Sequence, residues 1–525
     1  MDERKDVSGW VAVASIALVT LLALAASYAS RPRQPPVVEA KAPPVERPIL
    51  PTVAVWLSTA DRSLRLVRQP DVVMTAHEKQ PNDVIVDTGS TFQSMVGFGA
   101  ALTDSSAWLI QNRLNASQRS ALLQEMFGPP PGLNFNMTRL TIGASDFSLQ
   151  PYTLDDMPAG QVDPDLQHFN LAPNLLYVIP TVREAMAANP QLRIIASPWS
   201  APAWMKTSGN LIGGGLLEQF ESAYANYLVK YVDAYRSYGI PIFALTVQNE
   251  PGFVPITYPG MELPVATRTR LIAQYLGPAL ARRKSKTLIL GWDHNWDEPD
   301  QPLTELGDPD AARYIDGTAW HCYRGAPSTQ SQVHRAHPRK DTYITECYGG
   351  DWESARKGEL MWFARDLLLA GIRHWARGVV YWNLALDEQH GPHFGGCDNC
   401  KGVVTIDSAT GEVSRNDEYY AFAHFSRFVL PGAVRVGSSE TDKSINNVAF
   451  RNTDGSIVLV MVNSHTDARP VAVTQGQTRF EYTMPAQSVT TFVWNPDQMD
   501  AWIRQLLRWL ERMRGEQGDQ QPQGG

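Results

Sequence analysis

Two glutamates follow short apolar segments and could act together on one bond. Glu250 comes after the run Ile242 to Gln248, and Glu346 comes after Tyr343 to Thr345. A pair of carboxyl groups can protonate a leaving oxygen while attacking the adjacent carbon or activating water, which is the chemistry of glycoside hydrolysis. A single glutamate at such a position is equally well explained as a helix N-terminal charge or half of a salt bridge. Two at matching positions favour catalysis.

The elements that must position this pair are strands alternating with helices, typical of a parallel α/β architecture. One amphipathic segment carries its large side chains on a single face, as a helix does: Phe220, Tyr224, Tyr227, Leu228 and Tyr231. Eight strands fit a (β/α)8 TIM barrel, whose strand C-termini form the active site. Glu250 and Glu346 follow the fourth and seventh of the predicted strands, which are Gly97–Ala101, Asn136–Ile142, Arg193–Pro198, Ile242–Gln248, Thr287–Trp292, Thr318–Cys322, Thr342–Glu346 and Gly378–Asn383.

Short segments of alternating hydrophobicity lie on both sides of the barrel segment, which spans 93–430. Those at 52–92 and 431–496 are typical of strands with one buried face. We expect both sets to form a single all-β sandwich domain attached to the barrel.

The N-terminus predicts export. An apolar run of 17 residues, Trp10 to Ala26, follows Arg4 and Lys5, so residues 1–30 are a cleaved signal peptide or an uncleaved signal anchor. The Pro-rich linker at 31–51 is typical of an extended tether and favours the anchor. The expected location is periplasmic or extracellular, with residues 10–26 holding the protein at a membrane in the anchored case.

The C-terminal segment 497–525 predicts an amphipathic helix over Asp497 to Met513 and a disordered tail from Gly515. Its apolar face suits either a membrane surface or the β-domain.

The charge balance of the whole chain excludes one class of partner. Its 54 acidic and 46 basic residues give a net charge of -8, which argues against nucleic-acid binding.

Four cysteines are too few for a disulfide scaffold. Cys397 and Cys400 are spaced for one local disulfide, whereas a zinc site would need two clustered pairs, and Cys322 and Cys347 lie on separate predicted strands. Strand alternation turns Cys347 away from the barrel interior, so we expect a packed thiol that is no nucleophile.

Seven motifs occurring together carry a resemblance to a known family. The chain resembles the glucosylceramidase family, glycoside hydrolase family 30, over residues 97–397, and the flanking strands extend the resemblance to 52–496. The motifs are GFGAALTDSSAW, TRLTIGASDFSLQPYTLDD, ASPWSAPAWMKTSG, TVQNEPGF, WHCYRGAP, YITECYGG and YWNLALDEQHGPHFGGC.

The resemblance implies roles for the residues at the mouth of the barrel. Glu250 matches the general acid/base and Glu346 the nucleophile of a retaining double displacement. Asn249 matches the residue that hydrogen-bonds the 2-OH of the sugar, a contact that strengthens in the transition state.

Five further residues match positions around the sugar. By the resemblance, Asp104 and Trp199 hold glucose hydroxyls, Trp382 lines the same pocket, Tyr323 lies near the nucleophile, and Arg139 lies beside the catalytic pair. On sequence alone Asp104 could be a helix N-cap, the tryptophans barrel packing, and Arg139 a structural ion pair.

His321, His390 and His393 lie near the predicted mouth. Three histidines suggest a metal, but this chemistry needs no metal or cofactor, so we expect hydrogen-bonding or loop roles for them. The expected partner is a β-linked glucoside or glucan, with glucosylceramide, β-1,6-glucan and β-xyloside as the alternatives within the family. A carbohydrate-binding protein without activity and a structural envelope protein are the other two classes.

Overall fold

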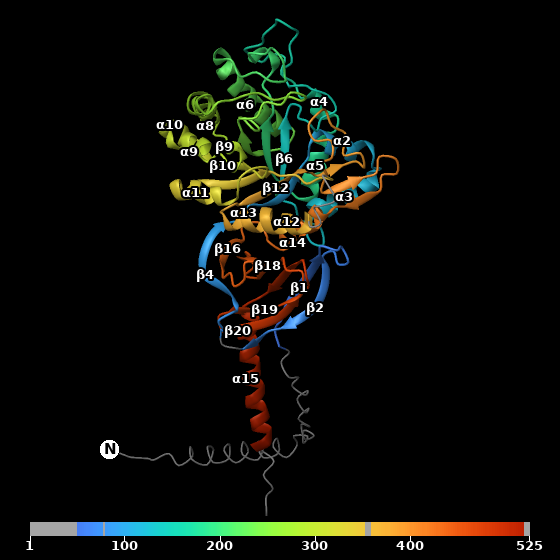
Figure 1. Ribbon diagram of the computed structural model, residues 1–525, viewed down its shortest axis with the longest axis vertical. Helices are drawn as coiled ribbons and strands as arrows, with labels where there is room; N and C mark the ends of the chain where they lie inside the picture. Colours follow the sequence, from blue (N-terminus) through green and yellow to red (C-terminus); the bar gives the residue numbers. More distant parts are fainter. Residues whose placement is uncertain (1–49, 77–78, 352–358, 519–525) are drawn as a thin grey trace, which may run out of the picture. The chain divides into compact units, whose positions relative to one another are not determined.

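The computed structural model describes residues 50–76, 79–351 and 359–518 (Figure 1). The predicted signal or anchor segment and residues 31–49 of the linker lie outside the described residues. Within them, we find no helix whose length and hydrophobicity would let it span a bilayer.

Eight parallel strands close into a barrel, which confirms the predicted fold class (Figure 1). The strands are buried on both faces because side chains fill the interior and helices cover the outside. Met137, Ile195, Leu290 and Tyr343 are among the interior residues. The strands are β5 (Gly97–Ala101), β6 (Met137–Ile142), β7 (Arg193–Pro198), β8 (Ile242–Thr246), β9 (Leu288–Asn295), β10 (Ile315–His321), β11 (Asp341–Glu346) and β12 (Gly378–Asn383).

The helices between these strands turn their apolar faces to the barrel. In α6, Tyr224, Tyr227, Leu228 and Tyr231 are fully buried on the face that the sequence predicts. The helices are α2 (Asp104–Asn112), α3 (Ala116–Phe127), α4 (Ala172–Leu175), α5 (Val178–Ala188), α6 (Glu221–Ser237), α7 (Val265–Arg270), η3 (Leu271–Leu276), α8 (Gly277–Arg282), α9 (Asp300–Gly307), α10 (Pro309–Ala312), α11 (Ser328–Ala336), α12 (Glu359–Trp362), η4 (Phe363–Leu369) and α13 (Ala370–Arg373), with short turns η1 (Ala203–Met205) and η2 (Glu218–Phe220).

Segments from before and after the barrel form one β-domain, as predicted, and its ten strands share one mixed sheet with the order β2-β1-β21-β18-β17-β16-β4-β19-β20-β3. Val55, Leu459 and Phe492 contribute to its own core. The strands are β1 (Thr52–Thr59), β2 (Val67–Val73), β3 (Thr75–Ala76), β4 (Val84–Ser94), β16 (Val434–Ser438), β17 (Ile445–Arg451), β18 (Ile457–Asn463), β19 (Arg469–Gln475), β20 (Thr478–Met484) and β21 (Ser488–Trp494). A small sheet, β13 (Ala385–Leu386), β14 (Val404–Ile406) and β15 (Val413–Arg415), follows β12.

Helix α14 (Asp417–Ser426) joins the barrel to the β-domain. The buried imidazole of His424 bonds the hydroxyls of Thr491 and Ser58, both at 2.8 Å. Burial lowers the pKa of His424 to about 3, so the ring is neutral and can act as donor at one nitrogen and acceptor at the other. The two domains therefore share a polar contact, and Val448, Phe450 and Val460 from the other face of the sheet belong to the same apolar cluster as the barrel.

The predicted C-terminal helix is α15 (Asp497–Gly518), a few residues longer than expected. Its first turns adjoin the β-domain, where Trp502 packs against the core of the sheet.

Candidate active site

The two glutamates converge at the C-terminal mouth of the barrel. One atom each from Glu250, Glu346 and the ring of His321 lie within 4.8 Å of one another. A separation near 5 Å between carboxyl groups suits direct attack on a sugar, whereas inverting enzymes leave about 6.5 to 9.5 Å for a water. Both side chains line an open cavity of about 930 Å³, large enough for more than one sugar ring.

The backbone at this mouth is held in an unfavourable conformation. Glu250, Trp292 and Asp293 all have positive φ, at 47°, 65° and 76°. Non-glycine residues rarely adopt this region, and where they do the surrounding structure must compensate about 1 to 3 kcal/mol each. Such strain concentrates at functional sites, and here it lies directly beside the paired carboxylates.

Asp293 is the centre of a buried network beneath the two glutamates. Its carboxylate accepts hydrogen bonds from five side chains on five other strands: Arg139 of β6, Ser197 of β7, Thr246 of β8, His321 of β10 and Thr345 of β11. Against the cost of burial, the charge of Arg139 and the bond from His321 hold the pKa of Asp293 far below its usual range. A permanent negative charge therefore fixes the cations that serve the glutamates.

Glu346 is fixed by donors on both carboxylate oxygens. Arg139 Nη1 donates to one oxygen, and the hydroxyl of Tyr323 donates to the other at 2.7 Å. Because a guanidinium can only donate, this arrangement selects the ionised carboxylate. Burial nevertheless raises the pKa of Glu346, opposed by the charges of His321 and Arg139. A charged but poorly solvated carboxylate is a reactive one.

His321 holds a proton next to Glu250. Its Nδ1 lies 3.0 Å from Glu250 Oε1, and its Nε2 lies 3.2 Å from Asp293 Oδ1. Burial disfavours its charge, but Glu346, Asp293 and Glu250 outweigh burial and raise the pKa of His321 to about 9. Burial alone would raise the pKa of Glu250, yet the bond from His321 and nearby positive charge lower it. The pair thus carries one proton that Glu250 can receive.

Among the described residues, this same trio is the one grouping of three close metal-ligating side chains. A metal would need the neutral imidazole of His321, whose raised pKa favours the protonated form. The guanidinium of Arg139 already supplies positive charge at Glu346. The trio is therefore better suited to moving a proton than to holding an ion.

The predicted sugar-binding residues are brought together with one exception. Trp199 and Trp382 stack with ring centroids 5.0 Å apart and line the cavity, and the guanidinium of Arg139 lies 5.0 Å from the ring of Trp199. Asn249 also lines the cavity, where its Oδ1 accepts a 2.8 Å bond from Arg139 Nη2. That bond uses the amide oxygen and leaves the amide nitrogen of Asn249 as a donor.

Asp104 is the exception. It does not line the cavity, and it is not the N-cap either, since Thr103 caps α2 and Asp104 is the first helical residue. Its buried carboxylate accepts bonds from Ser148 and Tyr152 at 2.7 and 2.8 Å, and burial raises its pKa to about 6. The other oxygen, Oδ1, has no hydrogen-bond partner within the described chain, and the contact of Asp104 with glucose hydroxyls stays a prediction.

The carboxyl group that faces the cavity instead is Asp146, in the loop after β6. Burial, together with the charges of Glu346 and Glu250, raises the pKa of Asp146 well above its usual value. The sequence offered a signal for Asp146, since it lies in the same motif as Arg139. The same holds for Asp293 and His321, which are polar residues at the ends of apolar strands.

Cys347 is not a packed thiol, which corrects the expectation from sequence. It forms a disulfide with Cys322, with Cα atoms 5.3 Å apart. Strands β10 and β11 are in register with His321 opposite Glu346, so the two cysteines that follow are neighbours. The bond ties the segment bearing Tyr323 to the segment bearing Glu346. Cys397 and Cys400 form the local disulfide, and no free cysteine remains among the described residues.

The remaining two histidines have loop roles. His390 Nδ1 bonds the carbonyl of Cys400, and His393 Nδ1 bonds the carbonyl of Gly395, each at 3.0 Å. Both rings therefore brace the loop after β13, which contributes Gly396 and Cys397 to the cavity.

Comparison with known proteins identifies the family. Residues 95–429 match the glycosyl hydrolase family 30 TIM-barrel domain, and residues 432–492 match the glycosyl hydrolase family 30 beta sandwich domain. The chain belongs to glycosyl hydrolase family 30. As a member, it is an O-glycosyl hydrolase of a retaining family, and a β-linked glucoside or glucan is consistent with its substrate.

Individual relatives of this family 30 member differ in their named substrates. The chain is 38% identical over 433 residues to an endo-1,6-beta-D-glucanase of Aspergillus fumigatus, covering 76% of this chain and 85% of the relative. It is 31% identical over 434 residues to the lysosomal acid glucosylceramidase of Mus musculus, covering 77% and 81%. A solved endo-beta1,6-glucanase superposes with a TM-score of 0.79 at 32% identity, covering 85% and 99%.

The proton on His321 predicts the alkaline limit of this family 30 enzyme. Because the folded pKa of His321 is raised to about 9, the His321–Glu250 pair keeps its proton at neutral pH and loses it as pH rises through about 9. We expect kcat/KM on an aryl β-glucoside to fall there, and His321→Gln to move the fall at least about one pH unit lower, towards the value of a carboxylic acid.

His294→Gln is the matched control, since His294 Nε2 lies 3.4 Å from the same Glu250 oxygen but burial lowers its pKa. This variant should leave the alkaline limit in place. A limit that does not move in His321→Gln would contradict the role of His321.

Proposed function

We propose that the protein is an endo-acting β-1,6-glucanase in which Glu346 is the nucleophile and Glu250 the general acid/base. The proposed substrate rests on the relatives that are named endo-1,6-beta-glucanases. One of them is a solved structure, of which the match to this chain covers 99%. The open cavity supports this proposal, because an endo-acting enzyme must admit a chain that continues on both sides of the cleaved bond.

In the first step, Glu346 attacks the anomeric carbon and Glu250 protonates the departing oxygen. When a sugar displaces water, an ion pair between His321 and Glu250 loses solvation, which favours transfer of the proton from Nδ1 to the carboxylate. His321 keeps its second nitrogen on Asp293 throughout. In the second step the negative charge of Glu346 is absent, so Glu250 accepts a proton from the incoming water, and water releases the sugar with net retention.

The rim of the cavity supports binding beyond the central sugar. Tyr258, Tyr348 and Trp362 line the cavity, and Phe253 and Ile256 lie on the loop after Glu250 with 46% and 87% of their surface exposed. Aromatic rings at such positions stack on the C–H faces of neighbouring glucose units.

Glucosylceramide hydrolysis is the second candidate. The mouse glucosylceramidase relative and the exposed apolar residues Phe253, Val254 and Ile256 favour it, because a lipid aglycone would contact an apolar rim. Cleavage of β-xylosides has weaker support, since the xylanase structures are under 25% identical.

We also propose that the enzyme works outside the cytoplasm. Both disulfides support this location, because such bonds persist in oxidising compartments and are rare in reducing ones. Attachment to a membrane through residues 10–26 remains a prediction from the sequence.

Substrate preference is tested with purified enzyme on β-1,6-glucan, β-1,3-glucan, glucosylceramide in detergent, and aryl β-glucoside and β-xyloside. We expect kcat/KM on β-1,6-glucan to exceed that on β-1,3-glucan by at least about 10-fold, with oligosaccharides of mixed length among the early products. Faster cleavage of glucosylceramide than of β-1,6-glucan would contradict the substrate proposal, and release of glucose alone would contradict endo action.

The roles of the two glutamates are tested separately. Glu346→Gly should lose roughly 10⁴-fold or more of turnover and regain activity on aryl glucosides with azide, which replaces the missing nucleophile. Glu250→Gln should keep a faster first step on substrates with good leaving groups than on glucan. Near-normal rates of Glu346→Gly without azide, or equal losses of Glu250→Gln on both substrates, would disprove the respective assignment.

A further inference from the structure

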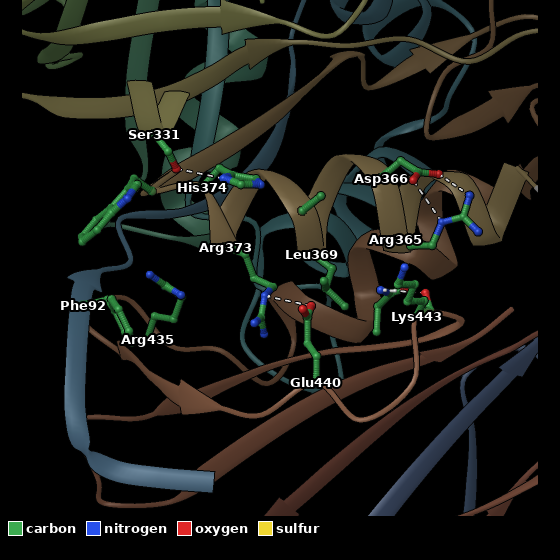
Figure 2. A pocket seen from close by; sticks show the side chains of 13 residues that line it. Phe92, Ser331, Arg365, Asp366, Leu369, Arg373, His374, Arg435, Glu440 and Lys443 are labelled. Carbon is green, nitrogen blue, oxygen red and sulfur yellow. Dashed lines mark hydrogen bonds and ion pairs between the residues drawn. The ribbon is translucent and has the colours of Figure 1, made fainter. Parts of the chain in front are cut away.

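A second cavity lies between the barrel helices and the β-domain, with a volume of about 760 Å³ (Figure 2). The residues that line it include Phe92 of β4, Arg435 of β16, Arg365 of η4, Arg373 of α13 and Trp375 just after α13. It shares no lining residue with the catalytic cavity. It is therefore a separate site.

Arg435 is the unusual residue of this cavity, because it is 93% buried without a counterion. Its exposed fraction is 7%, and no described carboxylate lies within 4.0 Å of its guanidinium. Burial and the charge of Arg373 lower the pKa of Arg435 to about 10. An isolated buried charge is costly, and a bound anion would compensate that cost.

The guanidinium of Arg435 is held in place by groups that leave its far edge open. Its Nε donates to Gln93 Oε1 at 2.9 Å, and Gln93 is itself fixed by bonds to the carbonyls of Ile372 and Ala376. The ring of Phe92 lies under the guanidinium, with the ring centroid 3.7 Å from its central carbon. The two terminal nitrogens have no hydrogen bond to any residue of the described chain. They form the fork that pairs with a carboxylate or phosphate.

The other charged residues of the cavity do not supply the missing anion. Arg373 Nε lies 3.3 Å from Glu440, and Arg365 pairs with Asp366 at 2.7 Å, so both carboxylates are already engaged (Figure 2). Four basic and two acidic side chains line the cavity, the fourth base being Lys443. The cavity therefore has a surplus of positive charge.

Trp375 gives a second sign that this cavity is built for binding. It has a φ of 82°, a conformation that bulky residues rarely adopt. Its ring stacks on His334 with centroids 3.7 Å apart and meets the edge of Phe92 at 5.8 Å. The strained backbone thus presents an aromatic wall beside Arg435.

We propose that this cavity binds an acidic saccharide, whose anionic group pairs with the free fork of Arg435. A cavity of about 760 Å³ is in the usual range for organic ligands and much larger than a bare oxyanion requires. The remaining space, beside Phe92, Trp375 and Leu369, suits the apolar face of a hexose. The anion is a uronate carboxylate or a sugar phosphate, which share this chemistry. The site would hold an acidic glycan away from the catalytic glutamates.

Binding is tested by calorimetry on the full-length enzyme with glucuronic acid, glucose 6-phosphate, inorganic phosphate and uncharged glucose. We expect at least one acidic sugar to bind in the millimolar range or tighter, to weaken with added salt, and to bind at least 10-fold better than glucose and phosphate. The better of the two acidic sugars identifies the source of the anion. If neither acidic sugar binds, the proposal is wrong. If inorganic phosphate binds as tightly as both acidic sugars, the site recognises the anion alone and the proposal of a saccharide ligand is wrong.

Variants assign the contact to Arg435. Arg435→Gln should weaken binding at least 10-fold, whereas Arg365→Gln, whose partner in the same cavity is Asp366, should change it less than threefold. Unchanged binding in Arg435→Gln overturns the assignment. If this variant does not fold, Arg435→Lys keeps the charge but not the fork, and unchanged binding in that variant overturns it equally. Normal hydrolysis of an aryl β-glucoside shows that each variant is folded.

Discussion

One buried carboxylate, Asp293, holds the chemistry of this enzyme together. It accepts hydrogen bonds from residues of β6, β7, β8, β10 and β11 while belonging to β9, so six of the eight strand ends meet on it. Its permanent charge positions Arg139 and His321, and these two cations act in turn on Glu346 and Glu250. Asp293 and the residues bonded to it, which lie beneath Glu250 and Glu346, therefore give these two carboxyl groups their different environments.

Much of the fold and the catalytic pair could be predicted from sequence because barrel strands are covered on both faces. The alternation of short strands with amphipathic helices predicts eight strands, and the structure has eight strands at these places. Glu250 and Glu346 each stand at or just after the end of one of these strands. The positions of Arg139, Trp199 and Tyr323 near the catalytic glutamates were predicted from the family resemblance. The structure places all three beside Glu250 and Glu346.

The other features of the site depend on contacts between segments that are far apart in the sequence. Asp104 and Asp146 both follow barrel strands, and only the path of the loops decides that Asp146 faces the cavity while Asp104 lies at the start of α2. The bond between Cys322 and Cys347 depends on the register of β10 against β11. Alternation along one strand gives the direction of a side chain but not its neighbour on the next strand.

The site at which the sugar is attached during turnover tests the role of Glu346 as the nucleophile. A fluorinated glucoside that forms the glycosyl enzyme quickly and releases it slowly would be followed by intact mass and peptide mapping. We expect one sugar bound to the peptide containing Glu346, in the wild type and not in Glu346→Gln. Attachment to another residue, or continued turnover with inversion at the anomeric carbon, would contradict this role of Glu346.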